Sequence, residues 1–346
     1  MQPSSDHPLL VGIDVGTSSV RAIAFDTQGR QIAAGSRRTP IVPTDTGGEY
    51  DPDTLFATAL AALADLGAAL AGRPVTGIAV ASIGESCVLV DRSGRPLAPS
   101  IAWYDRRAEA EAAAIAATVG RDRIFSISGH AAEHIFTLNK LVWMRKHWPD
   151  VMAKASHVLM MADWIAFRLS GEAATDPSLA SRTLYYDIRR RAWSAEMLAL
   201  AGVGTDFPAP LMASGTALGP VRREIFEATG LAGSPVVAVG GHDHVLGAFA
   251  TGLTRPGTMV NSLGTAEALL LATAAPLDDP EAVRRGYVQG AMETDRQMSY
   301  LAASLYSSGG AVDWVRSLVG DAPLAVLIAE AAAVPPGSNG VVFLPH

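Results

Sequence analysis

Residues 9–29 read LLVGIDVGTSSVRAIAFDTQG, and this stretch decides the fold. The apolar run at its start is typical of a buried strand, and a second run of strand composition follows a few small polar residues. We therefore predict two strands joined by a tight turn at Gly16, Thr17 and Ser18. Asp14 lies one residue before the end of the first strand. A carboxylate beside free backbone N–H groups and hydroxyls suits Mg²⁺ and phosphate oxygens, so this turn is a candidate phosphate-binding loop.

An ordinary β-hairpin with a glycine turn would have the same local sequence, and that alternative stays open. Two known phosphate motifs are excluded, because neither Gly-Lys-Ser/Thr nor a third glycine and a helix follows at the required place. A weak internal repeat favours phosphate binding. Gly264 and Thr265 form a second Gly-Thr turn, between strands that we predict over residues 259–261 and 266–273. Two such turns can contact one polyphosphate.

The composition limits the classes of function. The chain has 346 residues, 49% apolar and 18% charged, which is enough apolar material for two cores. Its net charge of −7 creates no basic field, so we expect neither nucleic acid nor a membrane as partner. Cys87 is the only cysteine, which excludes a disulfide framework and favours a reducing compartment.

Two segments bear on localisation. Residues 1–7 are polar and do not read as a secretory signal. Residues 55–71 are rich in alanine but carry Asp65 near the middle, which favours a buried helix over a membrane span. We expect Asp53 to cap this helix. Strand and helix patterns alternate around it, so we predict a mixed α/β protein located in the cytoplasm.

The segment VVAVGGHDHVLGA, residues 236–248, places an acid between two histidines after a strand and two glycines. Glycines allow a ligand to approach the backbone closely, and α/β folds bind ligands at the carboxyl ends of strands. Asp243 is therefore a candidate base that accepts the proton of a hydroxyl during phosphoryl transfer. Two alternatives stay open. His242, Asp243 and His244 could bind a transition metal, although their spacing suits this poorly, or Asp243 could cap a helix over residues 245–251.

Candidate substrate groups lie in the first half of the chain. Gly84 and Glu85 follow a predicted strand, and Trp103 with Asp105 and Arg107 ends another. Carboxylates and guanidinium groups beside an indole face suit a polyhydroxylated substrate, whose hydroxyls need donors and acceptors. The alternative is a tryptophan in the core beside surface arginines.

Taken in order, these motifs resemble the FGGY carbohydrate kinases, which phosphorylate sugars and polyols. The matching segments are GIDVGTSSVRAIAFD, GGEYDP, IAWYDRR, LNKLVWMRKHWPDV, DWIAFRLSGEAATDPSLASRTLYYDI, GGHDHVLGAFATG and NSLGTAEALL. The resemblance implies an actin-like ATPase fold of the ribonuclease H type, with two domains around a cleft. Residues 1–250 would form the sugar-binding domain, and residues 251–346 would begin the nucleotide-binding domain.

The resemblance also implies a role for each matched residue. Asp243 would be the catalytic base, and Asp14 the acidic residue near Mg²⁺. ATP would contact glycines and hydroxyl residues of two loops and a later helix, namely Gly16, Thr17, Ser18, Gly264, Thr265 and Gly310. The sugar would contact residues of the first domain, namely Gly84, Glu85, Trp103, Asp105 and Asp243, with Arg107 as a weaker candidate.

Two departures from the family pattern affect the expected function. Family members are usually longer, so we expect the second domain to be incomplete here. Residues 83–85 match neither the Gln-Arg-Glu of glycerol kinases nor the Met-His of xylulose kinases, so the substrate stays open, with a ketose or related polyol favoured. We expect ATP-dependent and Mg²⁺-dependent phosphorylation of a sugar or polyol. A non-catalytic sugar-binding or regulatory remnant and an actin-fold ATPase without a sugar acceptor are the alternatives, and a homodimer is left open.

Overall fold

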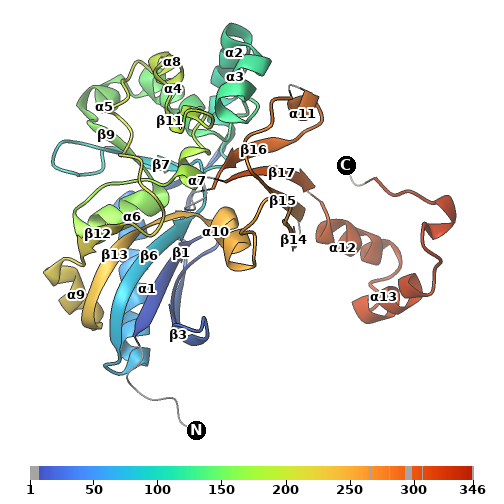
Figure 1. Cartoon of the computed structure of the whole chain (residues 1–346), viewed down its shortest axis with the longest axis horizontal. Helices are drawn as coiled ribbons and strands as arrows, with labels where there is room; N and C mark the ends of the chain where they lie inside the picture. The colour runs from blue at the N-terminus through green and yellow to red at the C-terminus, as the bar shows by residue number, and fades with distance from the viewer. Residues whose placement is uncertain (1–7, 265–266, 280, 293–297, 306, 345–346) are drawn as a thin grey trace.

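The computed structural model describes residues 8–264, 267–279, 281–292, 298–305 and 307–344 (Figure 1). At its centre is a six-stranded sheet in the order β12-β13-β6-β1-β2-β3. The strands β1, β6 and β13 run parallel, whereas β2, β3 and β12 pair antiparallel with their neighbours. Their bounds are β1 Leu9–Val15, β2 Ser19–Phe25, β3 Gln31–Arg38, β6 Pro74–Ser82, β12 Ala217–Pro220 and β13 Ala232–His242.

The opening stretch forms the predicted strand, turn and strand. Leu9, Val11, Ile13 and Val15 are all buried, and they alternate with more exposed residues along β1. This period of two places one face of the strand in the core.

Helix α1, Pro52–Leu70, lies against β2 and β3. The predicted cap is wrong by two residues, because Asp51 accepts the hydrogen bond from the Thr54 backbone N–H at 2.8 Å and Pro52 begins the helix. By length and composition alone α1 could cross a membrane. It buries Ala59, Ala62 and Leu66, as a core helix does.

The other elements of the first 230 residues surround the sheet (Figure 1). The predicted helices over residues 108–119, 138–147 and 162–169 are present within one residue at each end. The helices are η1 Arg106–Ala108, α2 Glu109–Val119, α3 Arg121–Ser128, α4 Thr137–His147, α5 Pro149–Lys154, α6 Met161–Ser170, α7 Pro177–Ala180, α8 Ala195–Leu200 and α9 Arg223–Thr229. The short strands are β4 Val42–Thr44, β5 Gly47–Tyr50, β7 Cys87–Val90, β8 Ser100–Ile101, β9 His157–Met160, β10 Tyr186–Asp187 and β11 Ala192–Trp193.

A second, antiparallel sheet has the order β14-β15-β17-β16. Its strands are β14 Met259–Leu263, β15 Glu267–Thr273, β16 Val288–Ala291 and β17 Ser299–Leu305. Helix α10, Asp243–Ala250, joins this sheet to the first, and its buried Val245 and Ala248 pack in one cluster with Leu270 and Tyr300. The residue at the start of α10 is therefore held between both sheets.

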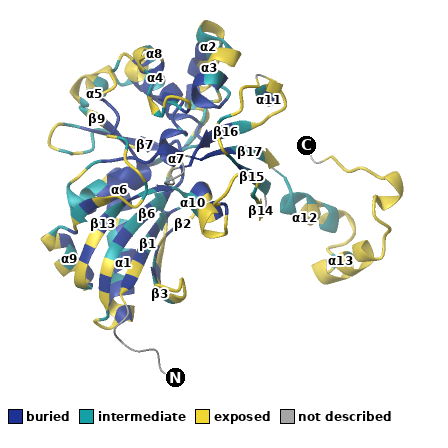
Figure 2. Cartoon of the chain, viewed as in Figure 1, coloured by how far each residue is buried: buried dark blue, intermediate teal, exposed yellow. Residues whose placement is uncertain are grey.

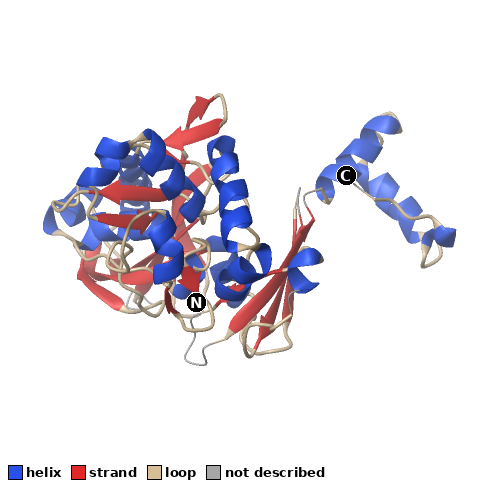
Figure 3. Cartoon of the chain, turned by 90° about the horizontal axis from the view of Figure 1, so that it is seen from above, coloured by secondary structure: helices blue, strands red, loops and turns tan. Residues whose placement is uncertain are grey.

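The C-terminal helices differ from the rest of the chain. Beyond α11, Glu281–Arg284, follow α12, Gly309–Leu318, α13, Leu324–Ala332, and η2, Ser338–Gly340. All residues of α12 and α13 are described, and none of them is buried (Figure 2). Seen from above, these helices extend away from both sheets (Figure 3). The strand predicted over residues 341–344 is wrong, because this segment is irregular and exposed.

Candidate active site

Three carboxylates gather at the carboxyl ends of three neighbouring parallel strands. Asp14 of β1 is level with Ala81 of β6, which is in turn level with Gly241 of β13. Glu85 follows β6, and Asp243 follows β13. Asp14 and Glu85 are close enough for their charges to raise the pKa of Asp243. The first sheet therefore brings together acids that lie more than two hundred residues apart in sequence.

Asp243 is the first residue of α10, and His242 occupies the cap position, so the alternative in which Asp243 caps the helix is wrong. The carboxylate Oδ1 accepts the His244 backbone N–H at 2.6 Å. Burial raises the pKa of Asp243 to about 6, against the opposing effect of His244. Burial also lowers the pKa of His242 well below its usual value, so its ring is neutral near neutral pH. A carboxylate with such a pKa is suited to general base catalysis.

Glu85 has a left-handed backbone, with φ 61°, which is uncommon for a residue other than glycine. Its side chain is 6% exposed, and its Oε1 accepts a hydrogen bond from Nε of the buried Arg182 at 2.6 Å. Arg182 also hydrogen-bonds Tyr300 of the second sheet. A Cβ on Gly84 would lie 2.9 Å from Cγ of Arg182, so this approach needs glycine. A left-handed backbone at a residue other than glycine, as at Glu85, is strained, and such strain is concentrated at functional sites.

The sequence analysis did not single out Arg182. Its signal was present, because the residue lies in the SRT part of a segment that carries the family resemblance. Nothing in the local pattern showed that it would pair with Glu85, which is 97 residues earlier in the chain.

Trp103 connects the predicted substrate loop to the predicted phosphate loop. Its Nε1 donates a hydrogen bond to Thr17 Oγ1 at 3.1 Å. Thr39 holds the predicted phosphate loop by two hydrogen bonds. Its Oγ1 donates to the Gly16 carbonyl at 2.7 Å, and its backbone N–H donates to the Ser18 carbonyl at 3.1 Å. Trp103 is half-buried, in contrast to a core tryptophan such as the fully buried Trp164.

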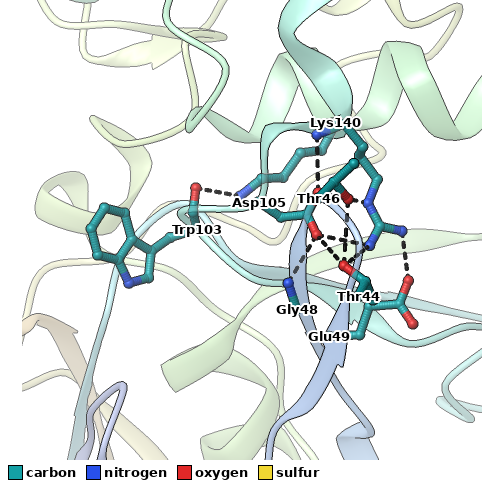
Figure 4. A network of polar contacts seen from close by, with 8 residues as sticks. Thr44, Thr46, Gly48, Glu49, Trp103, Asp105 and Lys140 are labelled. Atoms are coloured by element: carbon teal, nitrogen blue, oxygen red, sulfur yellow. Dashed lines mark hydrogen bonds and ion pairs between the residues drawn. The ribbon is translucent and has the colours of Figure 1, made fainter.

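Asp105 is fully buried, and its carboxylate is surrounded by hydrogen-bond donors of the protein (Figure 4). Burial raises its pKa, but the hydrogen bonds from Arg107, Thr46 and Thr44 outweigh this effect and hold the pKa well below its usual value. The carboxylate accepts six hydrogen bonds, from Thr44 Oγ1, Thr46 Oγ1, the Gly48 backbone N–H, the Arg107 backbone N–H, Arg107 Nε and Arg107 Nη2. Asp105 thereby joins β4 and β5 to the loop that carries Trp103.

A lysine that the sequence analysis did not identify joins the two substrate loops. Lys140 of α4 is fully buried, and its Nζ donates to the carbonyl oxygen of Glu85 at 3.3 Å. It also donates to the carbonyl oxygen of Trp103 at 3.5 Å (Figure 4). Burial lowers the pKa of Lys140 to about 8. Arg107 is also largely buried; it pairs with Glu49 at 2.5 Å and lies over the Trp143 ring, so it is no surface arginine.

The predicted nucleotide residues of the second half also come together. The Gly264 carbonyl accepts the Gly309 backbone N–H at 2.9 Å, and Gly310 is the second residue of α12. Ser308 Oγ donates to Glu267 Oε2 at 3.2 Å in the same place. Thr265 lies outside the described residues.

The predicted magnesium residue is Asp14. Asp14 is 29% exposed and accepts a hydrogen bond from Arg21 Nη2 at 2.5 Å. The described residues contain no group of three or more His, Cys, Asp and Glu suited to hold a metal, His242, Asp243 and His244 included. Because Mg²⁺ is usually held by one or two carboxylates together with substrate phosphates, the partly exposed Asp14 suits this ion.

Comparisons with known proteins identify the family of the chain. Residues 9–250 match the model of the N-terminal domain of the FGGY family of carbohydrate kinases. The chain is 30% identical to the xylulose kinase of Klebsiella pneumoniae over 339 residues, which are 98% of this chain and 69% of that protein. It is 30% identical to the autoinducer-2 kinase of Salmonella choleraesuis over 356 residues, covering 96% of this chain and 65% of that protein.

The structure of the xylulose kinase from Rhodospirillum rubrum superposes with a TM-score of 0.88 at 28% identity, over 97% of this chain and 69% of that one. This likeness confirms the predicted actin-like ATPase fold. The chain thus spans about two thirds of the length of each of these three proteins. Both the fold and the sequence lead to one conclusion: the chain belongs to the FGGY family of carbohydrate kinases.

Proposed function

We propose that the chain transfers the γ-phosphoryl group of ATP to a hydroxyl of an uncharged sugar or polyol, with a ketose favoured. One observation carries this proposal. Asp243 has a pKa raised to about 6 and lies at the carboxyl end of β13, among the acids that follow or end the two neighbouring parallel strands. A base that is ionised at neutral pH, yet close to its pKa, is suited to accept a hydroxyl proton.

Each side chain has a task in this reaction. Asp243 accepts the proton of the attacking hydroxyl. Glu85, held by Arg182, accepts hydrogen bonds from other substrate hydroxyls, and Trp103 offers its ring face to the C–H face of the substrate. Asp105 supports these contacts by holding the Trp103 loop in place. Mg²⁺, bound near Asp14, would neutralise phosphate charge.

The phosphates of ATP are assigned to Gly16, Thr17 and Ser18 on one side of the cleft. On the other side we assign them to the loop that begins at Gly264, with Gly310 near the nucleotide. The contact between Gly264 and Gly309 supports this grouping, because it places the loop at the start of α12. Such chemistry depends mainly on positioning and on fixed charges.

The charges of the site support an uncharged substrate. Asp14, Glu85 and Asp243 carry up to three negative charges, and two arginines balance only two of them, Arg21 beside Asp14 and Arg182 beside Glu85. A sugar acid would add a like charge to this space, which is unfavourable at low dielectric. The names of the similar proteins, xylulose kinase above all, support a ketose.

The test is formation of ADP from Mg-ATP in the presence of ketoses, polyols and sugar acids. We expect turnover with at least one uncharged ketose or polyol, and none with the matching acid. Calorimetry on the same compounds separates binding from reaction. Sugar binding without ADP formation would support the non-catalytic alternative, and ATP hydrolysis that no sugar accelerates would support an ATPase.

A further inference from the structure

Hydrogen bonds connect a buried acid, Asp176, and a buried serine, Ser178, to the residue before Asp243. Asp176 caps α7, and Asp176 and Ser178 are each 1% exposed. The Asp176 carboxylate accepts four hydrogen bonds, from the Ser178 backbone N–H at 3.1 Å, Ser178 Oγ at 2.9 Å, the Leu179 backbone N–H at 2.9 Å and Ser214 Oγ at 2.9 Å. This carboxylate is too enclosed to contact a substrate.

The network continues from α7 to β13. Ser178 Oγ donates its hydrogen to Asp176, and the same oxygen accepts the backbone N–H of His242 at 2.9 Å. His242 is the last residue of β13 and the residue before Asp243. The orientation of the Ser178 hydroxyl, set by Asp176, thus holds the backbone from which Asp243 projects.

Gly240 and Gly241, near the end of β13, allow β6 and α7 to approach the strand closely. A Cβ on Gly241 would lie 2.8 Å from Ser178 Oγ and 2.9 Å from Asp176 Oδ2, and a Cβ on Gly240 would lie 1.7 Å from the Val80 carbonyl oxygen of β6. The register of β13 against β6 also shifts between Ala238 and Gly241. Such irregularities redirect the side chains that follow them. The end of β13 is therefore fixed by β6 on one side and by α7 on the other.

We propose that Asp176 and Ser178 are positioning residues for Asp243: through the His242 amide they set the direction in which Asp243 enters the site. This inference rests on the proposed kinase function for its catalytic readout. Without the Ser178 hydroxyl, the His242 N–H loses its acceptor, and the start of α10 can shift to find another. Catalysis depends steeply on such small displacements of a reacting group.

The variant Ser178→Ala tests the proposal, with Ser214→Ala as its matched control. Both variants remove one hydroxyl bonded to Asp176 at the same distance, but of these two hydroxyls only that of Ser178 accepts a hydrogen bond from β13. We expect Ser178→Ala to lower kcat roughly 100-fold, with the KM for sugar and ATP little changed. We expect Ser214→Ala to keep kcat near that of the wild type. Equal losses in both variants, or none in Ser178→Ala, would overturn the proposal.

A second measurement does not depend on turnover. The titration of the Asp243 carboxyl can be followed by carbon-13 NMR and assigned by the loss of its signal in Asp243→Asn. We expect the pKa to fall from about 6 toward the ordinary 3.8 in Ser178→Ala, because a displaced carboxyl becomes better hydrated. An unchanged titration contradicts the proposal. If Ser178→Ala does not fold, Asp176→Asn, which keeps the shape of the side chain, is measured in the same way.

The two proposals fail in different ways. A wild-type chain that forms no ADP with any sugar ends the proposed function, and the titration then decides the positioning role alone. A wild-type chain that is active, with a Ser178→Ala variant that is equally active, ends the positioning role and leaves the kinase function intact.

Discussion

The surroundings of Asp105 and of Asp243 shift the pKa of a buried carboxylate in opposite directions. Burial acts to raise the pKa of both groups. Around Asp105, two threonines, one backbone amide and the Arg107 guanidinium and amide more than compensate, so its pKa falls. Around Asp243, the backbone N–H of His244 favours ionisation, whereas burial and the charges of Asp14 and Glu85 oppose it. The pKa of Asp243 therefore rises.

The difference shows that hydrogen-bond donors decide whether the pKa rise caused by burial is overcome, as at Asp105, or persists, as at Asp243. A carboxylate whose lone pairs are all taken by the protein holds its neighbours in place and has no capacity left for a substrate proton. A carboxylate with free lone pairs and a pKa near neutrality can act as a base. Pairs of acids with pKa values moved apart in this way are characteristic of active sites.

The largest expected effect is on turnover at Asp243. Asp243→Asn removes the proton acceptor and should lower kcat by about 1,000-fold, with little change in the KM for the sugar. Steady-state ADP formation measures it, and Asp65→Asn, at an exposed ion pair with Arg37, is the control. Activity close to that of the wild type in Asp243→Asn would remove this residue from the mechanism.

At Asp105 we expect a loss of stability instead. Asp105→Asn leaves the Arg107 guanidinium, of which the side chain is 10% exposed, without one of its two acidic partners. Breaking such a pair costs about 3–5 kcal/mol of unfolding free energy. Urea unfolding at pH 7 measures it, and Asp65→Asn should cost at most about 1 kcal/mol because its ion pair is exposed.

The pH dependence sharpens this test. The folded pKa of Asp105 is lowered, so its contribution is present above the unfolded pKa of about 4 and is lost as the pH falls through the folded pKa. The stability difference between wild type and Asp105→Asn should therefore stay constant from pH 6 to 8 and shrink only in acid. A difference no larger than that of Asp65→Asn at pH 7 would contradict the structural role.

Turnover should follow the ionisation of Asp243. With a folded pKa of about 6, the base is protonated below pH 6, so kcat should fall about tenfold per unit below that value and level off above it. A pH series of kcat at saturating sugar and ATP measures this. A flat profile between pH 5 and 8 would mean that Asp243 does not carry the proton.

The smallest expected effect is a gain in stability in Asp243→Asn. The raised pKa means that the folded protein holds the ionised carboxylate unfavourably, so wild type loses stability as the pH rises through about 6. Asp243→Asn should be more stable than wild type by about 1–2 kcal/mol at pH 8 and similar to it below pH 4. Thermal unfolding at both pH values measures it, and equal melting temperatures at pH 8 would contradict the raised pKa.

Much of the local structure was predictable from the sequence, because it depends on neighbouring residues. The apolar run at residues 9–13, the strand composition of residues 21–26 and the glycine turn between them predicted the first two strands, and helical patterns predicted α2, α4 and α6. Element ends were less predictable. The cap of α1 is Asp51 instead of the predicted Asp53, because a cap depends on the backbone angles of a single residue. For the same reason His242, and not Asp243 as in the alternative, occupies the cap position of α10.

The sequence by itself predicted Asp14, Glu85 and Asp243 as candidate acids, each in or shortly after a strand. Only the tertiary structure decided how each acid behaves. The donors of Asp105 come from residues up to 61 positions away, Arg182 reaches Glu85 across 97 positions, and Ser178 reaches the His242 amide across 64. A pKa depends on the groups within a few ångströms, and a folded chain fills that space mostly with residues that are distant in sequence.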